Sequence, residues 1–510
     1  MKTRLGRARL LFAVVLSLRV ACGVEIDPGQ YLEHIRFLAS EEMKGRGTGT
    51  PELERAADYL AAQFRGFGVE PGNGQSYFQS FPVTAHAHLG KNNQLVWRNG
   101  RRQALKFDSD FRPLNFSESG TVSGKVVFAG YGITAPEYNY DDYDGIDVRN
   151  KIVLLLRHEP QEFDEKSVFG GRVYTIHAQF ESKALNAKSH GARGVIFIND
   201  RPNHPSESDD LEQFSGALGP ASPGIPFVQV KAEVAEAWMT RAGRPLADAV
   251  KAIDKDLRPQ PFALPDSFEV EMRVDIERET RMVRNVMAYM PGQTGEYLII
   301  GAHYDHIGLG EQYSMASSEA GKKPHPGADD NASGTAGVLE LARWFSKQPR
   351  GRRGILFVTF AAEEIGLLGS SYFTNNPPRP LGNAVAMINL DMIGRPREGK
   401  VYVGGVGTGT TFGSIVNGMN GNGASKLNID TTTADGYGSS DHFSFTPKQI
   451  PVLFFFSGMH GDYHRPSDTW DKIDAPAAAE LLEYAGRVAE QLLAAPDRPR
   501  FIGVAHASGH

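Results

Sequence analysis

The strongest constraint on the fold is a series of short, mostly apolar segments in the C-terminal half of the chain. They lie at residues 297–302, 354–360, 384–390, 401–403 and 450–456. Segments of this length with so few polar residues are typical of strands that are buried on both faces. Helical periodicity separates and follows them, at about residues 333–347, 365–375, 411–419 and 475–494. This alternation predicts an α/β fold with a mixed, mostly parallel central sheet flanked by helices.

The composition is that of an ordinary soluble globular protein, with 41% hydrophobic and 22% charged residues among 510. This length allows about three domains of roughly 150 residues. The net charge of −6 and the lack of a long basic run argue against a nucleic-acid binder, because such proteins neutralise phosphates with Lys and Arg. The composition also excludes a disordered chain.

The first 23 residues have the pattern of a secretory signal peptide. Basic residues at positions 2–9 precede an apolar run at 10–18 and small residues at 20–23, which include the only cysteine, Cys22. The apolar run is too short to span a bilayer. We therefore expect an exported protein, periplasmic or extracellular, with no transmembrane segment in the mature chain. Two alternatives stay open: a lipid anchor on Cys22, for which Arg19 is unfavourable, and an uncleaved N-terminus at a membrane surface.

The rest of the chain divides into one discontinuous domain and one inserted module. Residues 25–120, with helices expected at 31–38 and 51–67 around a glycine-rich loop, are expected to form the N-terminal part of the discontinuous domain. Residues 121–264 have short strand-like segments, and are expected to form an inserted β-rich module with a few helices. Residues 265–494 are expected to complete the discontinuous domain, and 495–510 to form a C-terminal tail.

Polar side chains gather where the predicted strands end. They are His303 and Asp305, Glu363 and Glu364, Asp391, then His460, Asp462 and His464, with Asp329 and Asp330 before a helix. In open α/β sheets, ligands bind beyond the carboxyl ends of the strands. Each residue alone is more often a surface or capping residue. Two histidines and at least three carboxylates at one sheet edge are what a pair of zinc ions requires.

Charge balance favours two metal ions over one. Three carboxylates and a bridging hydroxide balance two doubly charged ions, whereas a single zinc would leave excess buried negative charge. Two ions also suit hydrolysis, because together they activate water and polarise a carbonyl.

These segments resemble the secreted dizinc aminopeptidase family that includes bacterial leucyl aminopeptidases and glutamate carboxypeptidase II. The matching motifs are HYDH (303–306), GADDNASG (327–334), AAEEIGLLGS (361–370), NLDMIG (389–394), SSDHFSF (439–445) and DYHRPSDT (462–469). The resemblance covers residues 285–494 closely, and residues 32–71 look like the family's N-terminal helical piece. The 121–264 module resembles the protease-associated domain that is often inserted in these enzymes.

The resemblance implies two zinc ions per chain. The implied ligands are His303, Asp330 and Asp391 for one ion, and Asp330, Glu364 and His464 for the other. Asp330 is preferred to Asp329 as the bridging ligand because the family's ligand lies four residues before the glycine matched by Gly334. Asp329 is then expected to be a surface or loop residue. The resemblance also implies a cis peptide bond between Asp330 and Asn331.

Further roles follow from the same resemblance. Glu363 would be the general base that takes a proton from the metal-bridging water and passes it to the leaving amine. Asp305 would bind and orient His303. Tyr463 would donate to the oxyanion unless it only packs, and Asp441 and His442 would line the substrate pocket unless they are structural. The other histidines are expected to be surface or structural: His34, His86, His88, His158, His177, His190, His204 and His325, with His506 and His510 in a disordered tail.

The leading hypothesis is a secreted zinc exopeptidase, foremost an aminopeptidase acting on peptide substrates. A dipeptidase or glutamate-type carboxypeptidase on the same site would need cations for the substrate carboxylate, and no Arg pair stands beside the motifs. A glutaminyl-cyclase-like transferase is disfavoured because it uses one zinc. A catalytically dead, receptor-like binding protein is disfavoured because every implied ligand and Glu363 are present. The sequence leaves the side-chain specificity, the oligomeric state and the role of the module open.

Overall fold

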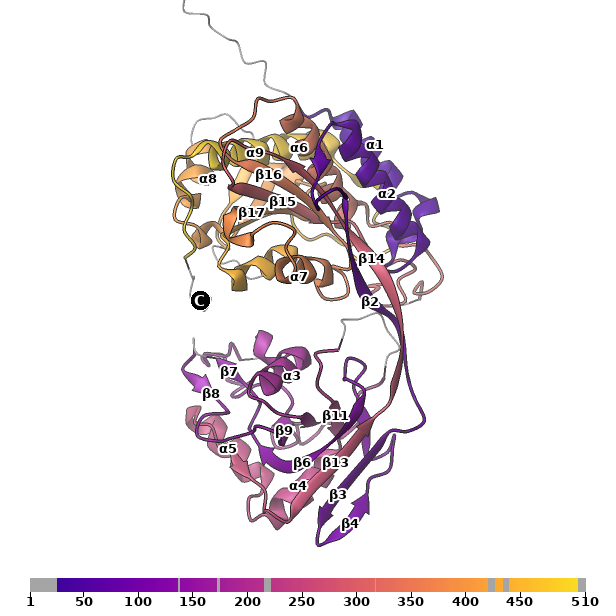
Figure 1. The fold of residues 1–510 in the computed structure, drawn as a ribbon, viewed down its shortest axis with the longest axis vertical. Coiled ribbons are helices and arrows are strands. Elements are labelled where there is room, and N and C mark those ends of the chain that lie inside the picture. The colour runs from indigo at the N-terminus through magenta and orange to yellow at the C-terminus, as the bar shows by residue number, and fades with distance from the viewer. Residues whose placement is uncertain are drawn as a thin grey trace, which may run out of the picture.

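The computed structural model describes residues 25–135, 138–171, 175–214, 222–316, 318–420, 427–433 and 440–502. The expected signal peptide, with Cys22, and the end of the tail, with His506 and His510, lie outside the described residues. No helix within the described ranges is long and apolar enough to cross a membrane. The chain forms two lobes that a long two-stranded ribbon connects (Figure 1).

The first lobe is built on a mixed, mostly parallel sheet. Its strand order is β1 (Glu70–Pro71), β14 (Ile276–Met290), β16 (Gly354–Phe360), β15 (Tyr297–His303), β17 (Ala384–Leu390), β20 (Val452–Phe456), β18 (Lys400–Gly404) and β19 (Asn428–Asp430). The central strands β16, β15, β17 and β20 are parallel, whereas β14 and β18 run antiparallel to them. The predicted fold class is confirmed, because these central strands are the apolar segments of the sequence.

Helices cover both faces of this sheet. Figure 1 shows α1 (Pro28–Leu38), α2 (Pro51–Gly66), α6 (Gly334–Ser346) and α9 (Ala475–Ala494) on one side, and α7 (Leu368–Asn375) on the side toward the second lobe. Successive side chains of a strand point to opposite faces. In β15, Leu298 and Ile300 therefore join the core under α6 and α9, while Tyr297 and Ile299 pack with Phe373 of α7. Helix α8 (Phe412–Asn420) adds Phe412 and Val416 to the first of these cores.

Helix starts in this lobe follow their local sequence. Thr50 caps α2 by accepting a hydrogen bond from the Leu53 N–H, and Pro51 occupies the first turn, where a missing N–H costs nothing. Asp474 caps α9 in the same way through the Ala477 N–H. Both helices accordingly begin where the sequence predicts, within one or two residues.

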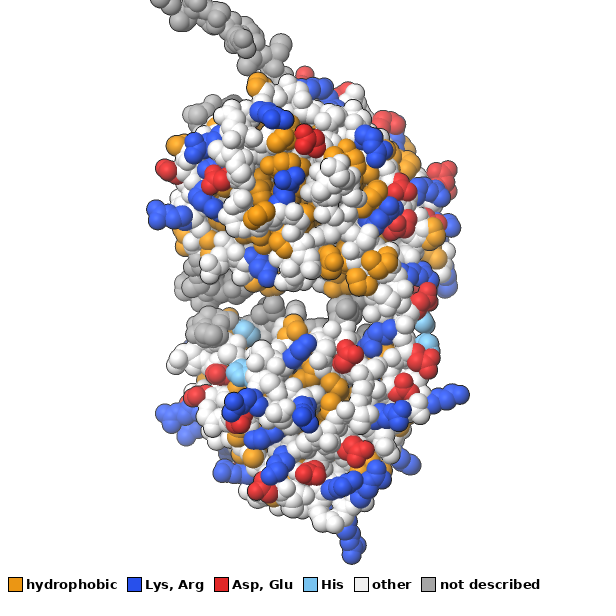
Figure 2. All heavy atoms as spheres, in the orientation of Figure 1, with side chains coloured by type: hydrophobic (Ala, Val, Ile, Leu, Met, Phe, Trp, Pro, Cys, Tyr) orange, Lys and Arg blue, Asp and Glu red, His pale blue; other side chains and the backbone are white. Residues whose placement is uncertain are grey.

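The second lobe has its own sheet. Its strand order is β4 (Arg101–Ala104), β3 (Gln94–Asn99), β13 (Phe268–Val274), β6 (Gly120–Phe128), β9 (Ile152–Leu156), β10 (Gly194–Ile198), β11 (Phe227–Val230) and β5 (Phe111–Pro113), with β12 (Phe262–Ala263) beside β6. Helices α3 (Phe180–Ser189), α4 (Ala232–Arg241) and α5 (Leu246–Asp256) and the short strands β7 (Thr134–Ala135) and β8 (Tyr140–Asp141) complete it. In the view of Figure 2, basic and acidic side chains are interspersed over both lobes.

The second lobe extends beyond the range of 121–264 that we expected for the inserted module. Strands β3, β4 and β5 precede this range and β13 follows it, yet all belong to the second sheet. The sequence did not reveal them because they lack a continuous apolar run. In β13, buried and exposed residues alternate, since one face packs on the core and the other meets solvent.

The ribbon between the lobes consists of β2 (Phe78–Leu89) and β14. The two strands pair antiparallel from Phe78 opposite Val286 to Leu89 opposite Ile276, with one bulge after Glu279. The middle of β14 is exposed, whereas the end beyond Asn285 is buried in the first sheet. The chain thus leaves the first lobe and returns to it through one continuous pair of strands.

Candidate metal centre

Five chain segments meet at the carboxyl edge of the first sheet. His303 is the last residue of β15, Glu363 and Glu364 follow β16, and Asp391 directly follows β17. His464 lies in the loop after β20, and Asp330 lies in the turn before α6. The four strands are parallel, so their carboxyl ends share one edge, as the sequence predicts.

Asp330 lies between two groups of side chains. Its Oδ1 is 3.4 Å from His303 Nε2, and His303 Nε2 is 3.5 Å from Asp391 Oδ1. Its Oδ2 is 3.3 Å from His464 Nε2, and His464 Nε2 is 3.0 Å from Glu364 Oε2. The structure therefore brings all five expected metal-binding side chains together and puts Asp330 in the shared position.

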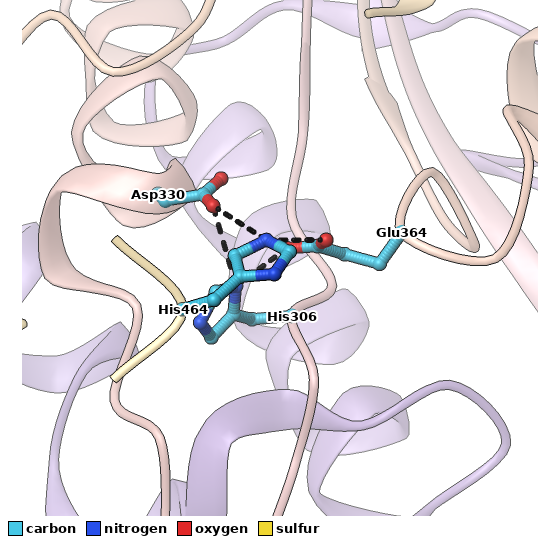
Figure 3. A group of neighbouring side chains, drawn as sticks. All are labelled: His306, Asp330, Glu364 and His464. Atoms are coloured by element: carbon cyan, nitrogen blue, oxygen red, sulfur yellow. Dashed lines mark hydrogen bonds and ion pairs between the residues drawn. The ribbon is translucent and has the colours of Figure 1, made fainter. Parts of the chain in front are cut away.

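A sixth side chain, His306, joins this cluster. Its Nδ1 is 2.5 Å from Glu364 Oε1 and 3.8 Å from Asp330 Oδ2. Figure 3 shows the carboxylates of Asp330 and Glu364 pointing at the imidazoles of His306 and His464 from opposite sides. Sequence reasoning missed His306, although it stands in the HYDH motif three residues after His303. The ring fits against the main chain of Gly327, where a Cβ would lie 2.6 Å from the imidazole.

Main-chain carbonyls orient two of the imidazoles. His303 Nδ1 is 3.2 Å from the carbonyl oxygen of Asp305, and His464 Nδ1 is 2.9 Å from that of Tyr313. A carbonyl oxygen can only accept, so each Nδ1 carries the hydrogen. Each Nε2 then presents a lone pair toward Asp330, which is how metal-binding imidazoles are held.

The cluster fits divalent metal ions. Within the described part of the chain, His464 Nε2 and Asp391 Oδ1 are buried without a hydrogen-bond partner. Four carboxylates are buried at this place, and burying negative charge is costly unless cations compensate it. The ligand atoms of His303, Asp330 and Asp391, and those of His306, Asp330, Glu364 and His464, each lie within 4.8 Å of one another. Imidazole nitrogens and carboxylate oxygens are the donors of zinc sites.

Asp305 lies beneath the cluster and contacts it differently from what we expected. Its Oδ1 is 3.7 Å from His303 Nδ1, too far for a hydrogen bond. The carboxylate instead accepts from the N–H groups of Glu363, at 3.1 Å, and Glu364, at 3.4 Å. It also accepts from the Thr48 hydroxyl, at 3.1 Å. Asp305 therefore positions the main chain of both glutamates, while its own carbonyl orients His303.

Glu363, the expected general base, borders the cluster. Its Oε2 is 3.9 Å from His303 Nε2, and its side chain is nearly buried. Burial raises the pKa of Glu363 well above its usual value, against the opposing effect of His303, and the neighbouring carboxylates of Glu364 and Asp441 raise it further. This side chain is near enough to the cluster to exchange a proton with a group held there.

The three remaining expected site residues have different surroundings. The Tyr463 ring stacks on His464 with 3.9 Å between centroids, and burial together with the nearby carboxylates raises the pKa of its hydroxyl. Asp441 and His442 begin a short 3-10 helix and are fully buried. His442 stacks on Phe454, and burial raises the pKa of Asp441 to about 7. These two residues lie in the interior beside the cluster.

Asp329 lies in the turn before α6, but it is not a surface residue. Asp329 is fully buried, its Oδ1 accepts from the Gly394 N–H at 2.7 Å, and its Oδ2 is 3.1 Å from His460 Nε2. Asp468 accepts hydrogen bonds from the main-chain N–H groups of Asp329 and Asp330, and these bonds hold the turn in place. The turn is buried between α6 and the sheet edge, so both aspartates point inward. The peptide bond between Asp330 and Asn331 is cis, as the resemblance implied.

The glycine-rich loop of the N-terminal region supports the centre through Arg46. Its buried guanidinium donates to the carbonyl oxygens of Leu38, Tyr304, Pro326 and Gly327. Burial lowers the pKa of Arg46 to about 10, although Asp305 and Asp330 act in the opposite direction. This one side chain ties the N-terminal loop to the segments that carry His303, His306 and Asp330.

We expected His158 and His204 to be surface or structural residues outside any group that could bind a metal ion, but they belong to one. His158 and His204 meet Glu162 in the second lobe. The two histidines are far apart in the sequence, so no local sequence pattern indicated the cluster.

The chain is similar to known peptidases. Residues 285–489 match the model of peptidase family M28, and residues 120–238 match that of the PA domain. The chain is 26% identical to aminopeptidase YwaD of Bacillus subtilis over 72% of this chain and 67% of that protein. It is 25% identical to an aminopeptidase of Pseudomonas aeruginosa over 74% of this chain and 59% of that protein. The solved aminopeptidase from Aneurinibacillus sp. strain AM-1 aligns over 94% of this chain and 95% of its own, with 23% identity and a TM-score of 0.49.

Proposed function

The chain carries a peptidase domain of family M28 and a PA domain, and on this premise we propose that it is a zinc-dependent aminopeptidase that removes N-terminal residues from peptides. The observation that carries the proposal is the position of Asp330, whose two carboxylate oxygens face His303 Nε2 and His464 Nε2 at 3.4 and 3.3 Å. A carboxylate shared in this way suits two ions held side by side.

Two zinc ions are the cofactors of this proposal. His303, Asp330 and Asp391 would hold one ion, and Asp330, Glu364 and His464 would hold the other. His306 donates to Glu364 Oε1, which leaves Oε2 to face His464. When bound, the ions polarise the scissile carbonyl and lower the pKa of the attacking water.

The chain's own residues move the protons. Glu363 accepts the proton of the attacking water and delivers it to the leaving amine, as general acid–base catalysis requires. Asp305 holds the main chain of Glu363 in place. The Tyr463 hydroxyl donates to the oxyanion that develops on the carbonyl oxygen.

The charges around the centre favour recognition of a substrate's amino end. A carboxypeptidase needs a cation for the substrate carboxylate, but Arg395 is held by Asp462 and Asp468, and Arg46 by four carbonyl oxygens. The carboxylates of Glu363 and Asp391, in contrast, attract an α-ammonium group. The proposed substrate class is therefore peptides with a free N-terminus.

We also propose how the chain is organised and exported. The peptidase domain is discontinuous and the second lobe is its insertion. Residues 1–23 direct export and are removed, and Edman sequencing of the protein from the culture medium or periplasm tests this by its first residue.

Hydrolysis of one peptide in three forms tests the activity. We expect cleavage of the form with a free N-terminus and of the form with an amidated C-terminus, but not of the N-acetylated form. Cleavage that tolerates N-acetylation but needs a free C-terminus would reject an aminopeptidase in favour of a carboxypeptidase. The absence of zinc from protein purified without chelators would reject the enzyme altogether.

A further inference from the structure

The second lobe contains a histidine and glutamate cluster remote in the fold from the centre described above. His158 follows β9, and His204 lies in the loop after β10. Strands β9 and β10 are parallel neighbours, so the loops after them lie at the same sheet edge. Glu162 lies between the two imidazoles: its Oε2 is 3.2 Å from His158 Nδ1 and its Oε1 is 2.5 Å from His204 Nε2.

We propose that His158, Glu162 and His204 form a further metal site, which binds one divalent transition-metal ion of the zinc type. The three ligand atoms lie within 4.8 Å of one another. Two imidazoles and one carboxylate are a donor set that zinc uses when its fourth position stays open. His158 and His204 also line a cavity of about 740 Å³.

A carboxylate next to His204 supports this assignment. Glu207 Oε1 is 2.8 Å from His204 Nδ1. With the Nδ1 hydrogen donated to Glu207, the lone pair of Nε2 points at Glu162. Metal-binding histidines are commonly held by such a carboxylate on the second ring nitrogen.

The carboxylate of the cluster is buried. The side chain of Glu162 is 1% exposed, and a buried carboxylate is costly unless a positive charge compensates it. Asp200 and Asp254 lie close enough for the charge of Glu162 to raise their pKa values, after the larger effect of burial.

The cluster shares geometric features with the centre in the first lobe. The shortest distance between a histidine nitrogen and a carboxylate oxygen is 2.5 Å in both clusters. It joins His306 and Glu364 in the first lobe, and His204 and Glu162 in the second. Both clusters stand at the carboxyl edge of parallel strands, and both include a histidine in the left-handed backbone region, His464 with φ 51° and His158 with φ 64°. Lys183 fixes the backbone of His158 by donating to its carbonyl oxygen at 2.7 Å.

A bound ion would join the loop after β9 to the loop after β10. Both loops form walls of the cavity. The proposed ion therefore joins two loops of the second lobe, and the proposal does not rest on the peptidase activity. One other arrangement has the same contacts: a protonated His204 that donates to Glu162 and Glu207 without a metal. Metal binding distinguishes the two.

The test uses the full-length protein, stripped with a chelator, dialysed and reloaded with Zn²⁺ or Co²⁺. Wild type is compared with His204→Gln and with the matched control His88→Gln, which replaces an exposed histidine that also pairs with a glutamate, Glu277, at 2.8 Å. We expect His204→Gln to bind one equivalent of metal less than wild type, whereas His88→Gln loses none. Peptide hydrolysis should be the same in all three proteins.

Glu207→Gln provides a second, gentler variant, because it keeps all three proposed ligands. Loss of such a supporting carboxylate weakens metal affinity by about 10- to 100-fold, measurable by competition with a chromophoric chelator. If His204→Gln does not fold by circular dichroism, Glu207→Gln decides the question. Equal metal content in wild type and folded His204→Gln, or equal affinity in wild type and Glu207→Gln, would overturn the proposal in favour of the protonated histidine.

Discussion

The carboxylate of Asp305 accepts a hydrogen bond from the main-chain N–H of Glu363 at 3.1 Å, across the ends of the parallel strands β15 and β16. The same carboxylate accepts from the Glu364 N–H and from the Thr48 hydroxyl. Glu363 faces His303, and Glu364 faces His306 and His464. One buried side chain therefore sets the position of two consecutive glutamates with different proposed tasks.

Asp305→Asn tests this positioning role. The substitution keeps the shape of the side chain but turns an NH₂ group toward donors that need an acceptor. We expect kcat to fall by about 10- to 100-fold, as when other supporting groups of metal sites are lost. Thr48→Val, which removes one of the three hydrogen bonds, serves as the milder comparison. An unchanged kcat in folded Asp305→Asn would contradict the role.

Glu363→Gln separates proton transfer from metal binding. Gln cannot take the proton of the attacking water, so kcat should fall by about 100- to 10,000-fold. The zinc content should stay at the wild-type value, because Glu363 is not among the proposed ligands. In Glu364→Gln we expect zinc to be lost instead. Activity within threefold of wild type in Glu363→Gln would remove it from the mechanism.

Arg46→Met tests the link between the N-terminal loop and the centre. Four main-chain carbonyls lose their buried donor. Each buried group left unpaired costs about 1–3 kcal/mol, so the first lobe should unfold at a clearly lower temperature in calorimetry. Zinc affinity should fall as well, because Arg46 holds the carbonyl of Gly327 three residues before Asp330. Arg36→Met, which removes an exposed guanidinium paired with Glu33, is the control and should have little effect.

Gly486→Ala tests the packing of α9 on α6. A Cβ at position 486 would lie 1.4 Å from Cζ3 of Trp344, so the buried indole or the helices must shift. Overpacking of this kind costs about 1–3 kcal/mol, although alanine is otherwise the better helix former. Gly418→Ala in α8 is the matched control, because nothing lies within 4 Å of its Cβ position. It should stabilise by about 0.5–1 kcal/mol. Equal melting temperatures for the two variants would show that the contact is not tight.

The sequence predicts the central strands and the helices of the first lobe well, because burial on both faces leaves an unmistakable apolar run in β15, β16 and β17. It does not predict β2, β13 or β14, where exposed and buried residues alternate or the strand bridges two lobes. It also misses β3, whose buried run is only three residues long. In the candidate metal centre, the residues that end strands were found from the sequence. His306 and the burial of Asp329 were not, because both depend on how the loops fold back over the sheet edge. The meeting of His158 with His204 depends on the pairing of β9 with β10.

The ribbon of β2 and β14 imposes an order of events on the newly made chain. Helices α1 and α2 pack against β14, α6 and α9, yet Gly66 and Ile276 stand 210 positions apart in the sequence. At ribosomal speeds this interval lasts on the order of 10 to 40 seconds. During that time the strands of the second lobe from β3 to β12 emerge. The last strand of its sheet, β13, comes just before β14, so the insertion can close its own core first and then deliver β14 beside β2. A lobe inserted into the middle of an enzyme in this way becomes the first unit of the chain that is able to fold.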